Sequence, residues 1–218
     1  MNLQSIPSMQ DVLDRLGGIA PGRILAVPPP GAATEDDLVR INARRDRLCE
    51  LVDGIVVEKS PSYVGSLVGG FFLYRLVDFN RGFRFGGVTA GNALFRLAPN
   101  LVRMPGGAFT SRDRRPSRRI PDVAIADFAP NLIVEVPNEG NPDAEVAIRR
   151  AEFLAAGVEV VWQVDRRAEV VEVFRRGEAS PTRLGRGDVL DGGDVLPGLR
   201  IPLNEVFDRS QFRRPKQA

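Results

Sequence analysis

The residue whose setting most clearly calls for chemistry is Glu135. It lies within Leu132-Ile133-Val134-Glu135-Val136, an apolar run typical of a central β-strand. Burying an isolated carboxylate is costly unless it is ion-paired, hydrogen-bonded or bound to a metal. The strand alone therefore leaves two interpretations of Glu135 open: a metal ligand, or a structural ion pair with one of the many arginines of this chain.

The residue types that the chain lacks restrict what a site could do. There is no histidine, and Cys49 is the single cysteine. Histidine general bases, Ser-His-Asp triads and zinc sites built on histidine are therefore excluded. A disulfide within the chain and a cysteine zinc cluster are excluded as well, and we interpret Cys49 as a structural thiol. Any metal would be held by oxygen ligands, which favours magnesium or manganese.

A basic segment at residues 111–119 is the clearest candidate for contact with nucleic acid. It has no hydrophobic residue and carries Arg112, Arg114, Arg115, Arg118 and Arg119. Clustered arginines suit phosphate groups, so we predict that this loop binds DNA. A solvated charged surface, interrupted by Asp113, is the plainer alternative. The net charge of +2 does not decide between them, because the placement of charge matters more than its sum.

These candidate residues must be positioned by a folded domain. The chain has 218 residues, 43% of them apolar, enough for one domain with a core. Asp53-Gly54 within residues 50–58 indicates a β-hairpin. Residues 64–79 are apolar nearly all round, which predicts a buried helix. A second helix is expected from Asn141 and Pro142 to Gly157, followed by strands at residues 158–164 and 170–174.

The two ends of the chain differ from this middle part in composition. Residues 1–33 are expected to form a helix at 8–16 and a proline-rich arm, residues 34–207 the main domain, and residues 208–218 a disordered basic tail. Within the main domain, another helix is expected from Thr34 to about Leu48.

Residues 1–10 lack the features of a secretory signal, and the longest apolar stretch is too short to span a bilayer. We therefore expect a cytoplasmic location and no membrane partner.

Five segments carry a resemblance to a known family. They are Glu50-Leu51-Val52-Asp53-Gly54, Val102-Arg103-Met104-Pro105, Val134-Glu135-Val136, Ala155-Ala156-Gly157-Val158 and Asp191-Gly192-Gly193-Asp194-Val195-Leu196-Pro197-Gly198. In this order and spacing, the chain resembles the putative restriction endonuclease family of the PD-(D/E)XK nuclease superfamily. The resemblance extends from about residue 34 to 207.

The resemblance implies both a fold and an activity. The fold is α/β (α+β), restriction-endonuclease-like, with a mixed central β-sheet flanked by helices. The activity is hydrolysis of DNA by Mg²⁺ or Mn²⁺ held in a carboxylate cluster, where the metal activates a water and stabilises charge on the phosphate. By the same resemblance Glu50 and Glu135 are catalytic metal ligands, Arg149 stands at the assisting lysine, and a homodimer is possible.

The chain departs from the family pattern at two catalytic positions. The motif aspartate is replaced by Gly106, so two of the three site carboxylates remain. Arg149 keeps the positive charge of the motif lysine, but it stays protonated and cannot act as a base. Losing an anionic ligand of a hard cation weakens both metal binding and catalysis. We therefore expect cleavage to be abolished or reduced by several orders of magnitude, and Glu135 to be coupled to Arg149 when no metal is bound.

Two alternatives follow from this degenerate motif. Asp122 follows Pro121 and precedes Glu135 by thirteen residues, so by motif alone it could replace the missing aspartate. The alignment with the family instead places Asp122 in a connecting loop, where it would be an ordinary turn residue. For function, the first hypothesis is an impaired Mg²⁺-dependent DNA endonuclease. The second is a non-catalytic module on the nuclease fold that binds nucleic acid or another protein.

Overall fold

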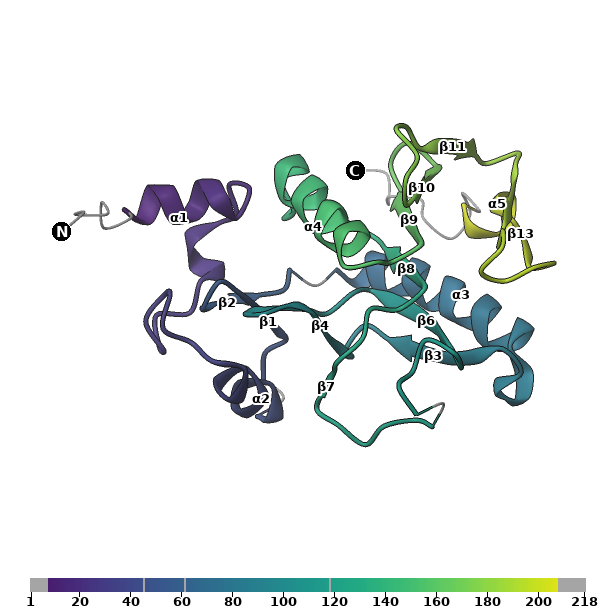
Figure 1. The fold of residues 1–218 in the computed structure, drawn as a ribbon. Coiled ribbons are helices and arrows are strands. Elements are labelled where there is room, and N and C mark those ends of the chain that lie inside the picture. The colour runs from purple at the N-terminus through teal and green to yellow at the C-terminus, as the bar shows by residue number, and fades with distance from the viewer. Residues whose placement is uncertain (1–7, 45, 61, 118, 208–218) are drawn as a thin grey trace.

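The computed structural model describes residues 8–44, 46–60, 62–117 and 119–207 (Figure 1). Two β-sheets form the framework. The strands of the first are β1 (Cys49–Val52), β2 (Ile55–Glu58), β4 (Leu94–Ala98), β5 (Leu101–Arg103) and β7 (Ile125–Ala126). The strands of the second are β3 (Gly86–Ala90), β6 (Gly107–Ser111), β8 (Leu132–Glu135), β9 (Val160–Asp165), β10 (Val170–Arg175) and β11 (Thr182–Gly185).

Both sheets are mixed. Their strand orders are β2-β1-β5-β4-β7 and β11-β10-β9-β8-β6-β3. In the first sheet β4 and β7 are parallel, and in the second β8 and β9 are parallel, while the other pairs are antiparallel. The expected α/β fold with mixed strands and flanking helices is therefore confirmed. The strands divide into two sheets, however, where the sequence indicated one central sheet.

Two capped helices precede the first sheet. Helix α1 (Met9–Arg15) is capped by Ser8, and α2 (Glu35–Ala43) is capped by Thr34, each through a capping box that satisfies free N–H groups. Between them lies a short 3₁₀ helix, η1 (Pro21–Arg23). The predicted end of α2 near Leu48 is wrong, because the Asn42 side chain bonds both the N–H and the carbonyl of Cys49 and turns the chain into β1.

The predicted hairpin is present as β1 and β2. Asp53 and Gly54 both have positive φ, 49° and 76°, which a two-residue turn of this kind requires. The first residue of β1, Cys49, is buried, and burial raises the pKa of its thiol to about 11. That setting agrees with a structural thiol. The hairpin also fixes Glu50, whose neighbour across the strands is Val57.

Two helices cover opposite faces of the second sheet. Alternate residues of a strand point to opposite faces. Leu132 and Val134 of β8 pack with α3 (Tyr63–Phe79), whereas Ile133 packs on the other face with Phe153 of α4 (Asp143–Ala155). Glu135 follows the same alternation and points to the face of α4. Pro142, rather than Asn141, is the N-cap of α4, because the Asn141 side chain bonds Asn138 and Glu145 instead.

Helix α3 is buried on one face only, which corrects the prediction of a buried helix. Its inner face carries Phe72 and Leu76, both with no exposed surface. Its outer face carries Tyr63, 80% exposed, and Tyr74, 61% exposed. Because one face of the helix is exposed, its apolar composition does not mean that the whole helix is buried. None of the helices in the described ranges is long and apolar enough to cross a membrane.

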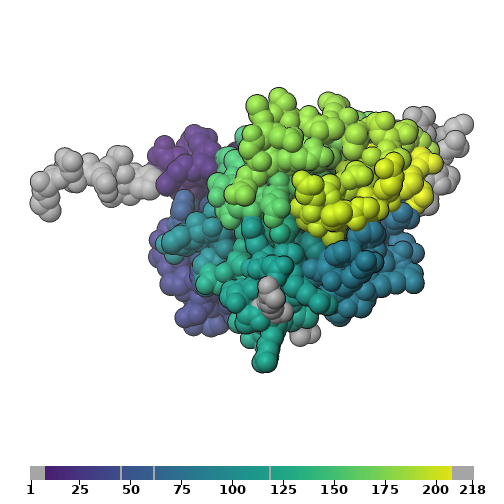
Figure 2. Space-filling view, turned by 45° about the vertical axis from the view of Figure 1, so that its right-hand side comes forward, coloured from purple at the N-terminus to yellow at the C-terminus, as the bar shows by residue number. Residues whose placement is uncertain are grey.

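The C-terminal segment completes the core on the side of α3. Strands β12 (Val189–Asp191) and β13 (Arg200–Pro202) pair with each other, and α5 (Leu203–Val206) follows them. Their apolar side chains share one cluster with α3 and Trp162. Figure 2 shows this segment, in yellow, against the blue region that contains α3. The predicted disordered tail at residues 208–218 lies outside the described residues.

Candidate active site

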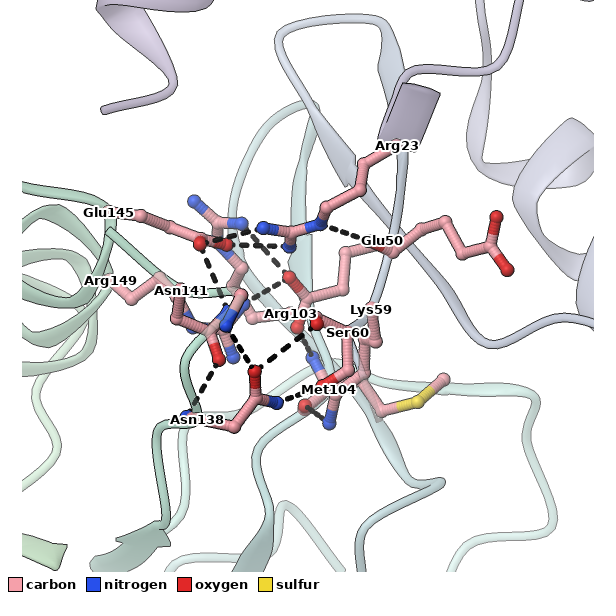
Figure 3. Close-up of polar contacts among 12 residues, drawn as sticks. Arg23, Glu50, Lys59, Ser60, Arg103, Met104, Asn138, Asn141, Glu145 and Arg149 are labelled. Carbon is pink, nitrogen blue, oxygen red and sulfur yellow. Dashed lines mark hydrogen bonds and ion pairs between the residues drawn. The ribbon is translucent and has the colours of Figure 1, made fainter. Parts of the chain in front are cut away.

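Glu50 is a buried carboxylate whose oxygens are both bonded. It is 1% exposed. Its Oε1 accepts a hydrogen bond of 2.7 Å from the backbone N–H of Met104. Its Oε2 accepts one of 3.0 Å from Nη1 of Arg103 and another from Nη1 of Arg149 (Figure 3). The carboxylate is therefore satisfied by protein donors.

Glu135 is bonded to the same arginine as Glu50. Its Oε1 accepts from Nη2 of Arg149 at 3.2 Å and from the backbone N–H of Gly106 at 3.3 Å. The Glu135 side chain is 17% exposed, so it lies at the border between the core and solvent. The predicted coupling of Glu135 to Arg149 is thus present. The same guanidinium also bridges to Glu50, which the sequence did not indicate.

The bridge continues into an ordered series of alternating charges. Arg103 bonds Glu50 and, through Nε and Nη2, also bonds Glu152 of α4 at 2.7 and 3.0 Å. The series therefore runs Glu135, Arg149, Glu50, Arg103, Glu152. We call these five residues the ion-pair network. It ties β1, the end of β5, the end of β8 and α4 together.

The electrostatics of the network keep Glu50 and Arg149 ionised. Burial acts to raise the pKa of Glu50, but the charges of Arg149, Arg103 and Lys59, with the hydrogen bond from Arg149, outweigh it and bring the pKa down to about 2. For Arg149 burial acts to lower the pKa, whereas Glu50 and Glu135 raise it further, and the net shift is upward. At neutral pH Glu50 is therefore a carboxylate and Arg149 a cation.

Gly106, which the family resemblance places at the motif aspartate, lies with its backbone close to a neighbouring strand. It joins β5 to β6 and packs against β8. A Cβ atom at this position would lie 2.8 Å from the carbonyl oxygen of Val134. Side-chain atoms do not approach a backbone oxygen that closely without a shift of the chain. The present backbone therefore has no room for the aspartate that the motif carries here.

The residues around Arg149 do not fit a divalent metal ion. Magnesium and manganese need several oxygen ligands with free lone pairs. Both oxygens of Glu50 already accept N–H groups, and a guanidinium that repels a second cation lies between the two carboxylates. Across the described parts of the chain, no group of three or more acidic, histidine or cysteine side chains is placed to hold a metal.

A cavity of about 410 Å³ opens beside this network. Its walls come from the segment after β2, the first half of α3, the segment after β8, and α4. Among the lining residues are Lys59, Ser60, Gly106, Glu135, Asn138 and Arg149. The Asn138 side chain bonds the carbonyl of Ser60 at 2.5 Å and so joins two of these walls.

Several residues of the site were missed from the sequence. Arg103 belongs to one of the segments that carry the family resemblance, but its type gave no sign of a bond to Glu50. Arg23, in the proline-rich arm, bonds both carboxylate oxygens of Glu145 at 2.8 and 2.7 Å and closes the N-terminal side of the site. Lys59 could have been singled out from the sequence, because it is one of only two lysines in a chain whose other basic residues are arginines.

Asp122 lies away from the cavity. It is exposed, in the irregular segment that precedes β7, and does not line the cavity. The family alignment implied this placement. The structure therefore brings Glu50, Glu135 and Arg149 together and leaves Asp122 outside.

The basic segment at residues 111–119 follows the opposite end of β6 from Gly106. Arg112 bonds the carbonyl of Phe83 at 2.8 Å, and Arg114 bonds the carbonyls of Ala129, at 3.0 Å, and Gly157. Arg115 is buried and Arg119 is exposed, while Arg118 lies outside the described residues. Nucleic-acid contact by these arginines stays a prediction, and it concerns a surface separate from the cavity.

Comparisons with known proteins agree on the fold. The chain is similar to a crystal structure described as a putative nuclease belonging to DUF820, from Anabaena variabilis ATCC 29413. The TM-score is 0.65 at 14% sequence identity, with 73% of this chain and 89% of that chain covered. No curated protein matches the chain. The family model described as Uma2, putative restriction endonuclease, matches residues 34–204, and the chain belongs to this family.

Proposed function

We propose that this protein is a DNA-binding member of the nuclease family in which Mg²⁺-dependent hydrolysis has been lost or strongly reduced. One observation carries the proposal: the guanidinium of Arg149 is bonded between Glu50 and Glu135. A positive side chain therefore balances the charges that a metal ion balances in an active enzyme of this type.

The chemistry of the remaining groups supports this proposal. Hydrolysis by such an enzyme needs a metal that activates water and stabilises charge on the phosphate. Here the carboxylates are bonded to arginines, and Arg149 remains protonated and cannot accept a proton from water. Loss of preorganised charge stabilisation typically lowers a rate by orders of magnitude. The expected result is a protein that keeps the shape of a nuclease without its rate.

DNA binding is supported by the positive charge of arginines in the basic segment at residues 111–119. Arg112 donates to the backbone carbonyl of Phe83, a neutral partner that leaves its positive charge in place. Arg114 donates to the carbonyl of Ala129 and also lies 3.9 Å from a carboxylate oxygen of Glu159, which balances part of its charge. Arg119 is exposed beside them. Phosphate contacts of this kind bind without sequence preference and weaken steeply with salt.

One observation favours a second candidate, a protein-interaction module. The outer face of α3 exposes Tyr63, Leu67, Tyr74 and Val77, which follow one another at spacings of four, seven and three residues and so share one side of the helix. Such a stripe is typical of a helix face that contacts another chain. A homodimer would be one assembly of this class.

The proposal is tested by measuring binding and cleavage together. The natural protein is incubated with plasmid and with single-stranded DNA, in Mg²⁺ or Mn²⁺, beside a Glu135→Gln variant. We expect salt-sensitive retention of DNA in a gel and no cleavage above that of the variant. Cleavage that depends on Glu135 would show that the enzyme is active. Failure to retain DNA at low salt would favour the protein-interaction module.

A further inference from the structure

Lys59 stands out in a chain that otherwise uses arginine. Of 30 basic residues only two are lysines, Lys59 and Lys216. Lys59 directly follows β2, and its backbone N–H bonds the carbonyl of Leu48 at 2.8 Å. Its position at the end of the hairpin is therefore fixed by the backbone, and its side chain lines the cavity beside the ion-pair network.

The ammonium of Lys59 is a desolvated cation with few partners. Its Nζ donates to the carbonyl of Met104 at 2.6 Å, in the close-up of Figure 3. An ammonium has three N–H donors, and the described residues supply no second acceptor and no carboxylate within ion-pair distance. Burial lowers the pKa of Lys59, while the more distant Glu135 and Glu50 act in the opposite direction.

The other cations that line the cavity are engaged differently. Arg23 is paired with Glu145, Arg47 with Glu58, and Arg149 with Glu50 and Glu135. Arg150 is the exception, because it bonds the neutral side chain of Gln163 and lies over the ring of Phe174. Within the described lining, Lys59 and Arg150 are thus the two cations that no carboxylate neutralises directly.

We propose that Lys59 is the anion ligand of this cavity, with Arg150 as the second cation, and that the anion is a phosphate group. A buried cation gains most from a counter-ion that also accepts its free N–H groups, and phosphate oxygens do both. Ser60 and Asn138 add neutral polar groups to the same wall. This inference deepens the proposed function and rests on it for the source of the phosphate, a nucleic-acid strand.

The scarcity of lysine allows a direct test on the whole protein. Protein labelled with ¹³C at lysine Cε has two side-chain resonances, which a Lys216→Gln variant assigns. Inorganic phosphate, thymidine monophosphate and an oligothymidylate are added in turn, with sodium chloride of equal ionic strength as the control. We expect a saturable shift of the Lys59 resonance with all three phosphates, and none with chloride or at Lys216. If Lys59 does not respond, it is only a counter-charge to Glu50 and Glu135, and the inference is wrong.

A second measurement separates this inference from the proposed function. Binding of oligothymidylate is measured against salt for the natural protein, Lys59→Gln, Lys59→Arg and Arg81→Gln. Loss of one phosphate contact on a single strand lowers the salt slope by about 0.7. We expect that decrease for Lys59→Gln only, because Lys59→Arg keeps the charge and Arg81 is an exposed arginine paired with Asp78 outside the cavity. An unchanged slope for Lys59→Gln would overturn the inference and leave DNA binding intact. A phosphate shift at Lys59 without DNA binding would support the inference and contradict the proposed function.

Discussion

The two ends of strand β6 use arginine in opposite ways. At the Gly106 end, Arg149 and Arg103 are bonded to carboxylates and form a network of alternating charge. At the other end, Arg112 and Arg114 are bonded to backbone carbonyls, and a longer contact of 3.9 Å links Arg114 to the carboxylate of Glu159. The first arrangement neutralises charge inside the protein, whereas the second holds positive charge near the surface. The abundance of arginine therefore has two meanings here, a structural one at the cavity and an electrostatic one at the loop.

The largest effect is expected when the guanidinium that joins the two carboxylates is removed. Arg149→Met leaves Glu50 buried with Arg103 as its remaining charged partner. Removing one partner of a buried ion pair typically costs about 3–5 kcal/mol, and we expect a loss of that size in urea unfolding. Arg81→Met is the matched control, because its pair with Asp78 is exposed to solvent and should contribute far less to stability. Equal small losses in both variants would contradict the structural role of Arg149.

Lowering the pH should reduce stability through Glu50 at the cavity end and not through the arginines at the loop end. The pKa of Glu50 is about 2 in the folded protein, against 4.5 for an ordinary glutamate. As the pH falls from about 4.5 to 2, the unfolded chain binds more protons than the folded one, so this contribution to stability is lost. The linkage amounts to about 3 kcal/mol at most. Urea midpoints measured across this range should fall less in Glu50→Gln than in the natural protein, whereas Arg114→Gln should keep the natural slope.

A single methyl group added at Gly106, the residue that the resemblance places at the motif aspartate, should destabilise the folded protein. We expect Gly106→Ala to lower the free energy of unfolding by about 1–3 kcal/mol, because its Cβ would crowd the Val134 carbonyl. Gly70→Ala, on the exposed face of α3, meets no atom within 4 Å and should gain up to about 1 kcal/mol of helix stability. Chemical denaturation of both variants checks the contrast. An unchanged free energy of unfolding for Gly106→Ala would show that the backbone has room for a side chain at this position, as the motif aspartate would need.

The loop end is expected to show the smallest effects on stability. Arg114→Gln removes donors to the carbonyls of Ala129 and Gly157, which should cost about 1–2 kcal/mol. Arg119→Gln should change stability by less than about 0.5 kcal/mol. Both variants should weaken DNA retention, and Arg119→Gln the more strongly, because Arg119 is exposed whereas Glu159 already balances part of the charge of Arg114. A gel-shift series beside thermal unfolding separates the two quantities, and unaltered retention in both would remove the loop from the binding surface.

The parts of the fold that local sequence determines were predictable. The hairpin follows from Asp53-Gly54, whose positive φ angles few other pairs adopt easily. The capped start of α2 follows from Thr34 and the acids after it. The end of α2 was not predictable, because it depends on a side-chain bond from Asn42 to a strand that follows. The exposed face of α3 also escaped prediction, since an apolar sequence does not say which of its faces finds a partner.

The candidate site was predictable only from the family resemblance. That resemblance brought Glu50, Glu135, Gly106 and Arg149 into one site, and helical spacing supported the place of Arg149. It could not show that one guanidinium serves both carboxylates, because residues 50 and 149 are 99 positions apart. The closure of the backbone at Gly106 and the position of Lys59 depend on how three segments pack, which no local pattern records.

Binding of Mn²⁺, with the free ion monitored by electron paramagnetic resonance, measures whether the two carboxylates still hold a metal. In our proposal Arg149 balances the charges of Glu50 and Glu135 in place of a metal. The natural protein should then bind no Mn²⁺ that is lost in Glu135→Gln, at concentrations up to the millimolar range. A stoichiometric Mn²⁺ site that Glu135→Gln removes would show that Arg149 yields to the metal, and would contradict the account.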